Sequence, residues 1–397
     1  MFVIQNGFTY IAFLMCLAGV LLALEKYAKW KIFNWVPPLV WIYVLNMIFC
    51  TMGMFDSEGC SAAYSALKNN LLYAMIFVML LRCDIKKLAK LGGRMAAIFL
   101  GGSVSIMIGF ILAFVIFKGA LGGGEFSWPA MAALCASWIG GSANMAAMES
   151  AFTIDPGAYG CALAVDTVYY SVWIALLLIM VKHAKKWDNA VKADTSKLEA
   201  VAEAASKEVS ASEKKKATSA DWIFLIGISL IVSALSQQVG VALNTGLSSI
   251  GLAMFDKGTL TTVFVTILGL ICAQTKLGKL PAVEELSNIY LYAVVSLLAS
   301  TASLTDLVSA PMWIVAGLLV LIVHIVIMFV LSKIFHWDCC MVSTASLANI
   351  GGSASAPIVA SAYNPSYAGI GVLMGVFGAA IGNFCGLIVG YIMQFLC

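Results

Sequence analysis

Charged residues are scarce in this chain of 397 residues, where they make up 11% of the sequence against about 25% in soluble globular domains. Because 62% of the residues are apolar, the chain cannot cover itself with a hydrated surface, which excludes a soluble fold. The net charge is only +3 and is spread along the chain, so no nucleic acid is expected as a partner. The composition predicts an all-α polytopic membrane protein, with the lipid bilayer and a small molecule or ion as its partners.

Motifs of cofactor and enzyme chemistry are missing too. The eleven cysteines form no Cys-x-x-Cys pair and no Cys/His spacing typical of a metal site, and they are interpreted as small packing residues. The predicted spans contain no His-Glu-x-x-His zinc motif, no Gly-x-Gly-Asp aspartyl motif and no Ser/His pair on a nucleophile elbow, and no Walker motif occurs. We therefore expect that the chain is not an enzyme, has no cofactor and does not itself use ATP.

Twelve apolar segments have about the length that a helix needs to cross a bilayer core of about 30 Å. They are expected at 7–24, 33–54, 67–83, 95–117, 128–151, 157–181, 221–242, 258–274, 288–305, 311–332, 340–362 and 366–396. Between the sixth and the seventh, 16 of the 43 charged residues fall within 40 positions, Lys182–Asp221. The predicted organisation is a first transmembrane half (1–181), a charged soluble connector (182–220) and a second transmembrane half (221–397).

Two of these spans carry the same interruption. The sequence Ile139-Gly-Gly-Ser-Ala-Asn144 in the fifth span recurs as Ile350-Gly-Gly-Ser-Ala-Ser355 in the eleventh. Glycine pairs followed by small polar residues interrupt a helix and release backbone groups, which a membrane tolerates only where protein buries them or a cavity hydrates them. Two interrupted segments at matching places in two halves are typical of the binding site of a secondary transporter. The alternative is close helix packing through small residues.

Basic residues predict the direction of the spans but do not decide whether the two halves are parallel or inverted. Lys26, Lys29 and Lys31, and then the group Lys86–Arg94, mark two cytoplasmic loops, so the N-terminus is expected outside. Twelve crossings would make the two halves parallel. Thirteen crossings, with two short ones between 221 and 255, would invert the second half and place the connector outside. The prediction is thirteen.

Few ionisable side chains lie inside the predicted spans. Asp166, in the middle of the sixth span, is the main candidate for a functional carboxylate, because such a group costs a few kcal/mol in the membrane and normally faces a pathway or a partner. The alternative is a structural hydrogen bond to Tyr169, to Tyr170 or to freed backbone of the crossed helices. Glu149 belongs either to the site or to the hydrated cytoplasmic interface. His324 is expected to be a packing residue rather than a proton relay, and Asp306 a helix cap.

The two interruptions predict a polar centre within the membrane. Where two broken helices cross, half-helix N-termini offer N–H groups and C-termini offer carbonyls. Because burial disfavours the ionised form of a carboxylate, a proton and Na⁺ can compete for Asp166. The remaining candidate ligands for the ion or the substrate are Ser142, Asn144, Asn349, Ser353 and Ser355. A bound Na⁺ at Asp166 is the only metal ion considered.

The motifs Ile139–Asn144 and Asn349–Pro357 resemble those of the YjcL-like family, catalogued as domain of unknown function 819. The resemblance covers nearly the whole chain apart from the connector. That family is grouped with the cation/proton antiporters and the bile-acid:sodium symporters. The resemblance implies a panel (scaffold) domain and a core domain with two crossed discontinuous helices, which move as an elevator, often in a homodimer formed through the scaffold.

The resemblance also implies roles for individual residues. Ser142 and Asn144 fall on the first crossing helix, whereas Ser353 and Ser355 fall on the second. Asp166 takes the place where antiporters keep their ion-binding aspartate. Antiporters often have Asn or Asp immediately before it, where this chain has a valine, so electroneutral exchange and symport both stay open.

These observations predict a secondary active transporter in the cell membrane, coupled to Na⁺ or H⁺. Its cargo is expected to be a small anionic organic solute, and its mechanism elevator-like alternating access. A Na⁺/H⁺ antiporter without an organic substrate is the first alternative. A non-transporting receptor or scaffold that signals through the connector is the second.

Overall fold

The computed structural model describes residues 3–34, 36–83, 92–193, 216–249, 257–302 and 310–397. Every regular element in these ranges is helical, and seven helices are long and apolar enough to span a membrane. The prediction of an all-α polytopic membrane protein is therefore confirmed. The expected cap at Asp306 and the central part of the connector, 194–215, lie outside the described residues.

Both halves of the chain contain one broken helix at the place where the sequence predicts it. The first half consists of α1 (Gly7–Ala23), α2 (Pro38–Thr51), α3 (Glu58–Leu80), α5 (Gly92–Phe117), α6 (Gly124–Gly140), α7 (Ser142–Ala151) and α8 (Pro156–Val191). The second half consists of α10 (Ser219–Ser249), α11 (Lys257–Ala273), α12 (Val283–Ala299), α13 (Ala310–Phe335), α14 (Cys339–Ile350), α15 (Gly352–Tyr363) and α16 (Ala368–Phe395). The breaks fall between α6 and α7 and between α14 and α15. Helix α8 continues well past the expected end of the sixth span at 181.

Each broken helix folds back on itself, so the prediction of two crossed discontinuous helices is wrong in this respect. The rings of Trp128 at the start of α6 and Phe152 after α7 are 4.9 Å apart, although a straight helix would separate these residues by about 36 Å. In the second half, Cys339 Sγ at the start of α14 lies 3.3 Å from the Tyr363 hydroxyl at the end of α15. The two segments are helical hairpins, and neither crosses the membrane.

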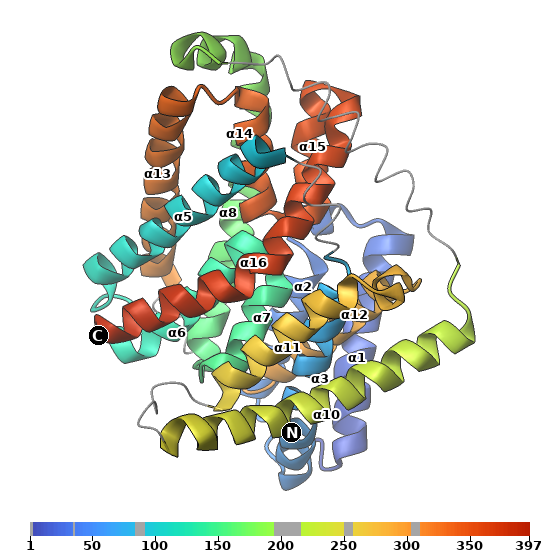
Figure 1. Cartoon of the computed structure of the whole chain (residues 1–397). Helices are drawn as coiled ribbons and strands as arrows, with labels where there is room; N and C mark the ends of the chain where they lie inside the picture. Colours follow the sequence, from blue (N-terminus) through green and yellow to red (C-terminus); the bar gives the residue numbers. More distant parts are fainter. Residues whose placement is uncertain (1–2, 35, 84–91, 194–215, 250–256, 303–309) are drawn as a thin grey trace.

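The hairpins decide the direction of the two halves. Because a hairpin returns to its own side, each half has five described helices outside its hairpin, and an odd number of passes inverts the second half relative to the first. The antiparallel packing of α5 and α13 follows from this: Arg94 at the start of α5 donates to the backbone oxygen of His336 after α13, and Gly109 in the middle of α5 lies against Val320. Figure 1 shows the two helices crossing.

The charged residues agree with ten crossings rather than with the thirteen predicted. Helix α10 is continuous over Ser219–Ser249, so the described residues do not contain the two short crossings expected between 221 and 255. One end of the described bundle gathers most of the basic residues at helix ends: Lys26, Lys29, Lys31, Arg82, Arg94, Lys182, Lys185, Lys186, Lys276, Lys279 and Lys333. That end is the cytoplasmic one by the positive-inside rule. Both described ends of the connector lie at that end, so the same rule favours a cytoplasmic connector over the predicted outside one.

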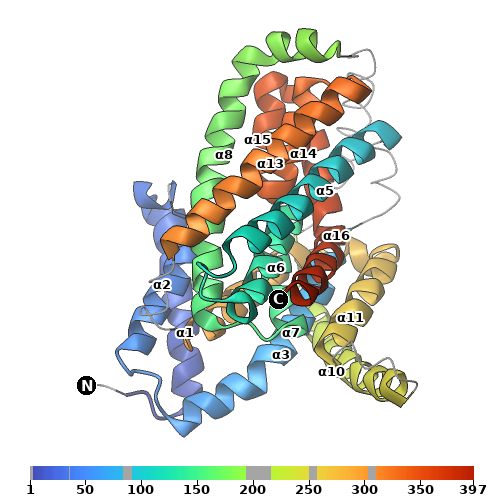
Figure 2. The same cartoon turned by 90° about the vertical axis from the view of Figure 1, so that its left-hand side faces the viewer.

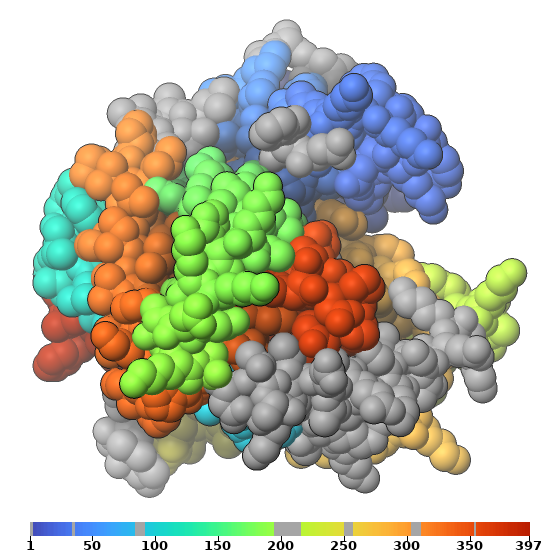
Figure 3. Space-filling view, turned by 90° about the horizontal axis from the view of Figure 1, so that it is seen from above, coloured from blue at the N-terminus to red at the C-terminus, as the bar shows by residue number. Residues whose placement is uncertain are grey.

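The helices form two groups. In the scaffold, α3 packs against α10, α11 and α12, and α12 packs against α1 and α2; the core contains α5, α8, α13, α16 and both hairpins. In Figure 2 the scaffold helices occupy the lower part of the molecule and α13, α14 and α15 the upper part. Seen from above, α8 (green) lies between α13 (orange) and α15 (orange-red) (Figure 3). Helix α8 of the first half therefore packs against the hairpin of the second half.

A row of glycines on α16 receives the first hairpin. Gly378, Gly382, Gly386 and Gly390 recur every four residues and lie on one face of the helix. A methyl group at any of these positions would collide with α6, α7 or Phe152. Small residues on one helix face let two backbones approach closely in a membrane. The hairpin is thereby fixed against α16, with the other face of its tip turned toward α8.

Candidate functional site

The two hairpin tips and helix α8 enclose a cavity of about 220 Å³. Gly141 and Ser142 line it from the first tip, and Ile350 and Gly351 line it from the second. The other lining residues come from the start of α2 (Pro37, Leu39 and Val40), from α6 (Ser137) and from α8 (Leu163, Asp166, Thr167 and Tyr170). Segments more than two hundred residues apart in the sequence thus meet at one polar space.

Asp166 is the only carboxylic acid among the residues that line this cavity. The hydroxyl of Ser137, on α6 just before the first tip, donates to Asp166 Oδ2 at 3.2 Å. The aspartate side chain therefore connects α8 to the hairpin and still faces the cavity. The predicted alternative, a hydrogen bond to a neighbouring tyrosine, is not the contact that the structure shows, because the Tyr169 hydroxyl instead donates to the Ile314 carbonyl at 2.6 Å.

The backbone at the tips carries partial charges of both signs. Helix α6 ends because Gly141 has φ +96° and ψ 172°, a conformation from which a helix cannot continue and which only glycine adopts readily. Helix α7 begins at the next residue, and α15 begins at Gly352 with φ +72°. Neither start has a side-chain cap in the described structure. The cavity is thus next to two helix N-termini, which favour anions, and two C-termini, which favour cations.

Asn144 and Ser355 occupy equivalent places behind the two tips, outside the cavity lining. Both side chains are buried. The Asn144 side chain lies against Gly140, and Ser355 Oγ lies against Gly351. Within the described residues, neither Asn144 Oδ1 nor Ser355 Oγ has a hydrogen-bond partner. The repeated motif therefore places one uncommitted oxygen beside each pair of half-helix ends.

The amide nitrogen of Asn144 anchors the first hairpin to its neighbours. Asn144 Nδ2 donates to Asn383 Oδ1 at 2.9 Å and to the Ala379 carbonyl at 3.2 Å, both on α16. Asn383 Nδ2 in turn donates to Thr266 Oγ1 at 3.1 Å, on scaffold helix α11. The predicted site residue is thus part of a chain of amides that runs from the hairpin to the scaffold.

Asn349 and His324 belong to a separate buried network. Asn349 Oδ1 accepts a hydrogen bond from Ser103 Oγ at 2.7 Å, and Asn349 Nδ2 donates to the Ala345 carbonyl at 2.9 Å. His324 Nδ1 and Nε2 lie 2.6 and 2.7 Å from the hydroxyls of Ser105 and Ser346. Because both ring nitrogens have a partner, a neutral histidine satisfies the network. Both side chains are thus held by hydrogen bonds, and neither is among the residues that line the cavity.

Glu149 does not line the cavity. It lies near the outer end of α7 and forms an ion pair of 3.0 Å with Lys68 of α3, and the two side chains are 6% and 20% exposed. The burial of Glu149 does not fit the alternative of a hydrated interface position. The pair connects the core to the scaffold. Ser353 lies in α15, but its side chain is outside the described part of the structure.

The sequence analysis did not single out four features of this region: Ser137, Lys68, the glycine row of α16 and Asn383. Ser137 is three residues before the first glycine pair, and its position on the same face as the tip was readable from helix periodicity. Lys68 lies at the beginning of a predicted span, where an intramembrane cation calls for a partner. The row Gly378–Gly390 shows a period of four in the printed sequence. Asn383, in contrast, gave no signal, because its partners come from distant segments.

The fold and the cavity define a multi-pass, all-α membrane protein made of two inverted repeats with opposed helical hairpins. The chain belongs to the family described as Protein of unknown function (DUF819), which matches residues 12–396. A similar protein is "Uncharacterized membrane protein YjcL" of Bacillus subtilis (strain 168), with 26% identity over 397 residues. The match covers 95% of this chain and 94% of that protein. The predicted family is therefore confirmed.

Proposed function

We propose that this protein is a secondary active transporter that binds its cargo between the two hairpin tips and Asp166. The observation that carries the proposal is the cavity itself, in which two interrupted helices from inverted repeats meet one carboxylate. Secondary transporters bind substrate and coupling ion at such an interface between repeats. The absence of a Walker motif in the sequence fits a gradient-driven process.

Asp166 is the proposed site of the coupling ion, which is Na⁺ or H⁺. Its carboxylate lines the cavity and accepts a hydrogen bond from Ser137. The C-terminal end of α6 adds carbonyl dipoles beside it, and the hydroxyl of Ser142 lines the same space. Oxygen ligands of this kind suit Na⁺, and a buried carboxylate also suits a proton. Asn144 Oδ1 and Ser355 Oγ provide further oxygens immediately behind the tips.

A small anionic solute is the proposed cargo. The N-termini of α7 and α15 offer backbone N–H groups and positive partial charge, and no Lys or Arg lines the cavity. A cation bound at Asp166 would neutralise the carboxylate before an anion approaches. In this conformation, about 220 Å³ is below the 300–1,000 Å³ of typical ligand pockets, which favours a solute of few atoms.

Elevator-like movement of the core against the scaffold is the proposed route to alternating access. Hydrogen bonds join the two groups at several places, among them Ser150 with Thr262 at 2.7 Å and Thr259 with the Ala151 carbonyl at 3.2 Å, and the movement would have to exchange these contacts. The proposal places the protein in the cell membrane. A homodimer stays a prediction, which the mass of the purified protein in detergent would test.

The experiment measures thermal unfolding of the purified protein in NaCl and in KCl at equal ionic strength. A ligand at a hundred times its Kd stabilises the native state by about 2.7 kcal/mol. Wild type is compared with Asp166→Asn, which keeps the shape of the side chain and removes its charge. Asp188→Asn is the matched control, because Asp188 is on the same helix and lies away from the cavity.

Sodium-specific stabilisation in wild type and Asp188→Asn that is lost in Asp166→Asn would support Na⁺ coupling at Asp166. Stabilisation that persists in Asp166→Asn would refute the assigned carboxylate. No sodium effect in any variant would assign the coupling to protons, and pH-driven uptake into proteoliposomes would then have to depend on Asp166.

A Na⁺/H⁺ antiporter is the second candidate, because the cavity is small and contains a single carboxylate. A panel of small organic anions separates the two functions: a transporter of organic solutes is stabilised by at least one of them in the presence of Na⁺, and a pure antiporter by none. Neither candidate is an enzyme. Ion flux that persists when 194–215 is deleted would argue against a receptor that signals through the connector.

A further inference from the structure

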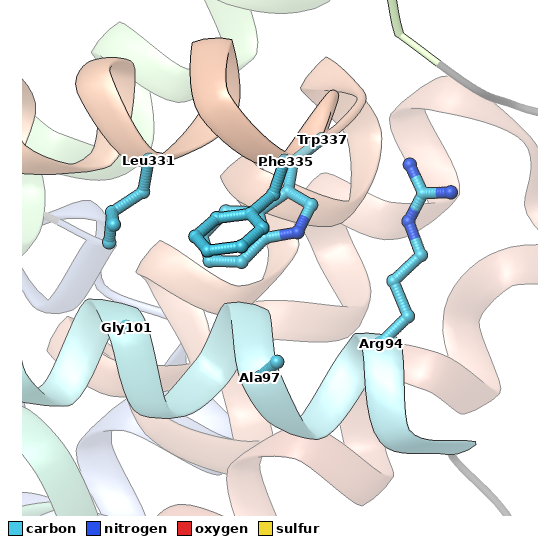
Figure 4. Close-up of a pocket in the computed structure, with 6 residues that line it drawn as sticks. All are labelled: Arg94, Ala97, Gly101, Leu331, Phe335 and Trp337. Carbon is cyan, nitrogen blue, oxygen red and sulfur yellow. The ribbon is translucent and has the colours of Figure 1, made fainter.

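A second hollow, of about 470 Å³, opens on the outer face of the core between α5 and α13, away from the transport cavity. Arg94, Ala97 and Gly101 line it from one face of α5, and Leu331, Phe335 and Trp337 line it from α13 and the residues after it. Figure 4 shows the stacked rings of Phe335 and Trp337 above α5, with the guanidinium of Arg94 at one end. The lining is apolar except at that end.

The hollow opens on an apolar, exposed face of the core. Side chains next to it on the same two helices are apolar and strongly exposed, among them Ile334 (61%) and Val104 (51%). In a membrane protein such side chains contact acyl chains. Ala97 and Gly101 present little side chain to the hollow on α5, and Leu331 and Trp337 lie directly against Gly101. Together these residues line an apolar channel that is open on its outer side.

Arg94 is fixed at the cytoplasmic end of this channel. It lies in the first turn of α5, and its Nη2 donates to the His336 carbonyl at 2.7 Å. Arginine is always charged and has five N–H donors that match phosphate oxygens. The positive end of the α5 dipole lies at the same place. Asp338, the N-cap of α14, is close enough to interact electrostatically with Arg94, so one side of the guanidinium is directed toward the protein.

We propose that this hollow binds an anionic phospholipid of the cytoplasmic leaflet, with the phosphate at Arg94 and an acyl chain along Ala97 and Gly101. The cytoplasmic leaflet is the one that carries anionic lipids, and basic pockets between transmembrane helices on this side bind their headgroups. The charge and the apolar channel fit the two parts of one lipid molecule. Free phosphate would use the arginine but not the channel. The site is independent of the transport cavity.

Binding is tested on the full chain in detergent, titrated with phosphatidylglycerol or with phosphatidylcholine of the same acyl chains. Native mass spectrometry counts retained lipids, and thermal unfolding reports stabilisation. Arg94→Gln removes the charge but keeps a donor for His336. Lys333→Gln removes a charge from an exposed residue near the same end of α13 that does not line the hollow. Ala97→Leu fills the channel at an exposed position and leaves the charge unchanged.

We expect phosphatidylglycerol to bind wild type and Lys333→Gln alike and to stabilise both. Its affinity should fall about fivefold in Arg94→Gln, the factor that one basic residue contributes near an anionic lipid surface, and should also fall in Ala97→Leu. Equal binding of both lipids, or an equal loss in Lys333→Gln, would overturn the proposal in favour of nonspecific association. Stabilisation by inorganic phosphate alone would overturn it in favour of a free-anion site.

Discussion

Cysteines placed at the two ends of a helical hairpin should cross-link, which tests the largest departure of this fold from a bundle of continuous helices. The chosen pair is Trp128→Cys with Phe152→Cys, in a chain whose other cysteines are replaced by serine or alanine. The rings of the native pair are 4.9 Å apart. If α6 and α7 formed one helix across the bilayer, the two positions would be separated by about 36 Å. The two arrangements therefore differ by far more than the reach of a short bifunctional thiol reagent.

The assay compares migration on a denaturing gel after a protease cut introduced between the two positions, with and without the reagent. The control pair is Trp128→Cys with Ser142→Cys at the tip, which about 20 Å of helix keeps apart in either arrangement. The second hairpin needs only Tyr363→Cys, because Cys339 is native and already contacts this side chain. Absence of a cross-link in both hairpins, with membrane-impermeant labels reaching the two ends from opposite sides, would refute the hairpins and the inverted repeat derived from them.

Two further predictions concern the stability of the core. Gly141→Ala should lower the free energy of unfolding by about 1–3 kcal/mol, the cost of a backbone conformation that only glycine adopts readily. Gly19→Ala in α1 should raise the free energy of unfolding by about 0.5–1 kcal/mol, because no atom lies within 4 Å of the new methyl group. Detergent-titration unfolding measures both, and equal effects would contradict the backbone argument. Lys68→Met should cost about 3 kcal/mol, because it leaves Glu149 buried without its cation. Lys68→Arg should restore most of the loss, and a stable Lys68→Met protein would show that the ion pair contributes little.

Much of the helix layout was readable from the sequence because lipid imposes it. Apolar length located the spans, and the repeated glycine pairs located both breaks to within a residue, at Gly141 and Gly351. These signals are local, because glycine at the point of interruption allows the backbone to leave the helical conformation. Asp166 was singled out for a similar reason, since an isolated carboxylate in an apolar segment has few acceptable surroundings. Its place in the cavity agrees with that reasoning.

The direction of the chain after each break was not readable, because it depends on distant partners. Glycine allows the helix to stop at 141, but the return of α7 depends on packing against Gly382 and Gly386 of α16. Placing Lys276 and Lys279 on the same side as the earlier basic loops required an odd number of crossings between equivalent helices of the two halves. A thirteenth crossing and a pair of hairpins satisfy that requirement equally well. The partner of Asn349 likewise comes from α5, about 250 residues away in sequence.

The repeat is symmetric in its backbone and asymmetric in its chemistry, which bears on how the site would work. Both tips present one helix start and one helix end, but only α8 places a carboxylate beside them; near the equivalent position α16 has Gly375. The glycine row of α16 fixes the first hairpin along its length. The Ser137 hydroxyl, which donates a hydrogen bond to Asp166, is therefore held in place. The second hairpin packs against α8 through Tyr170 and Gly351, on the opposite side of the cavity. An ion at Asp166 would therefore act on both hairpins at once: it would change a contact with the first and the charge that faces the second. The proposed coupling of ion and solute rests on that shared position, because an anionic solute held by the α15 N-terminus would be repelled by Asp166 unless a cation were bound first.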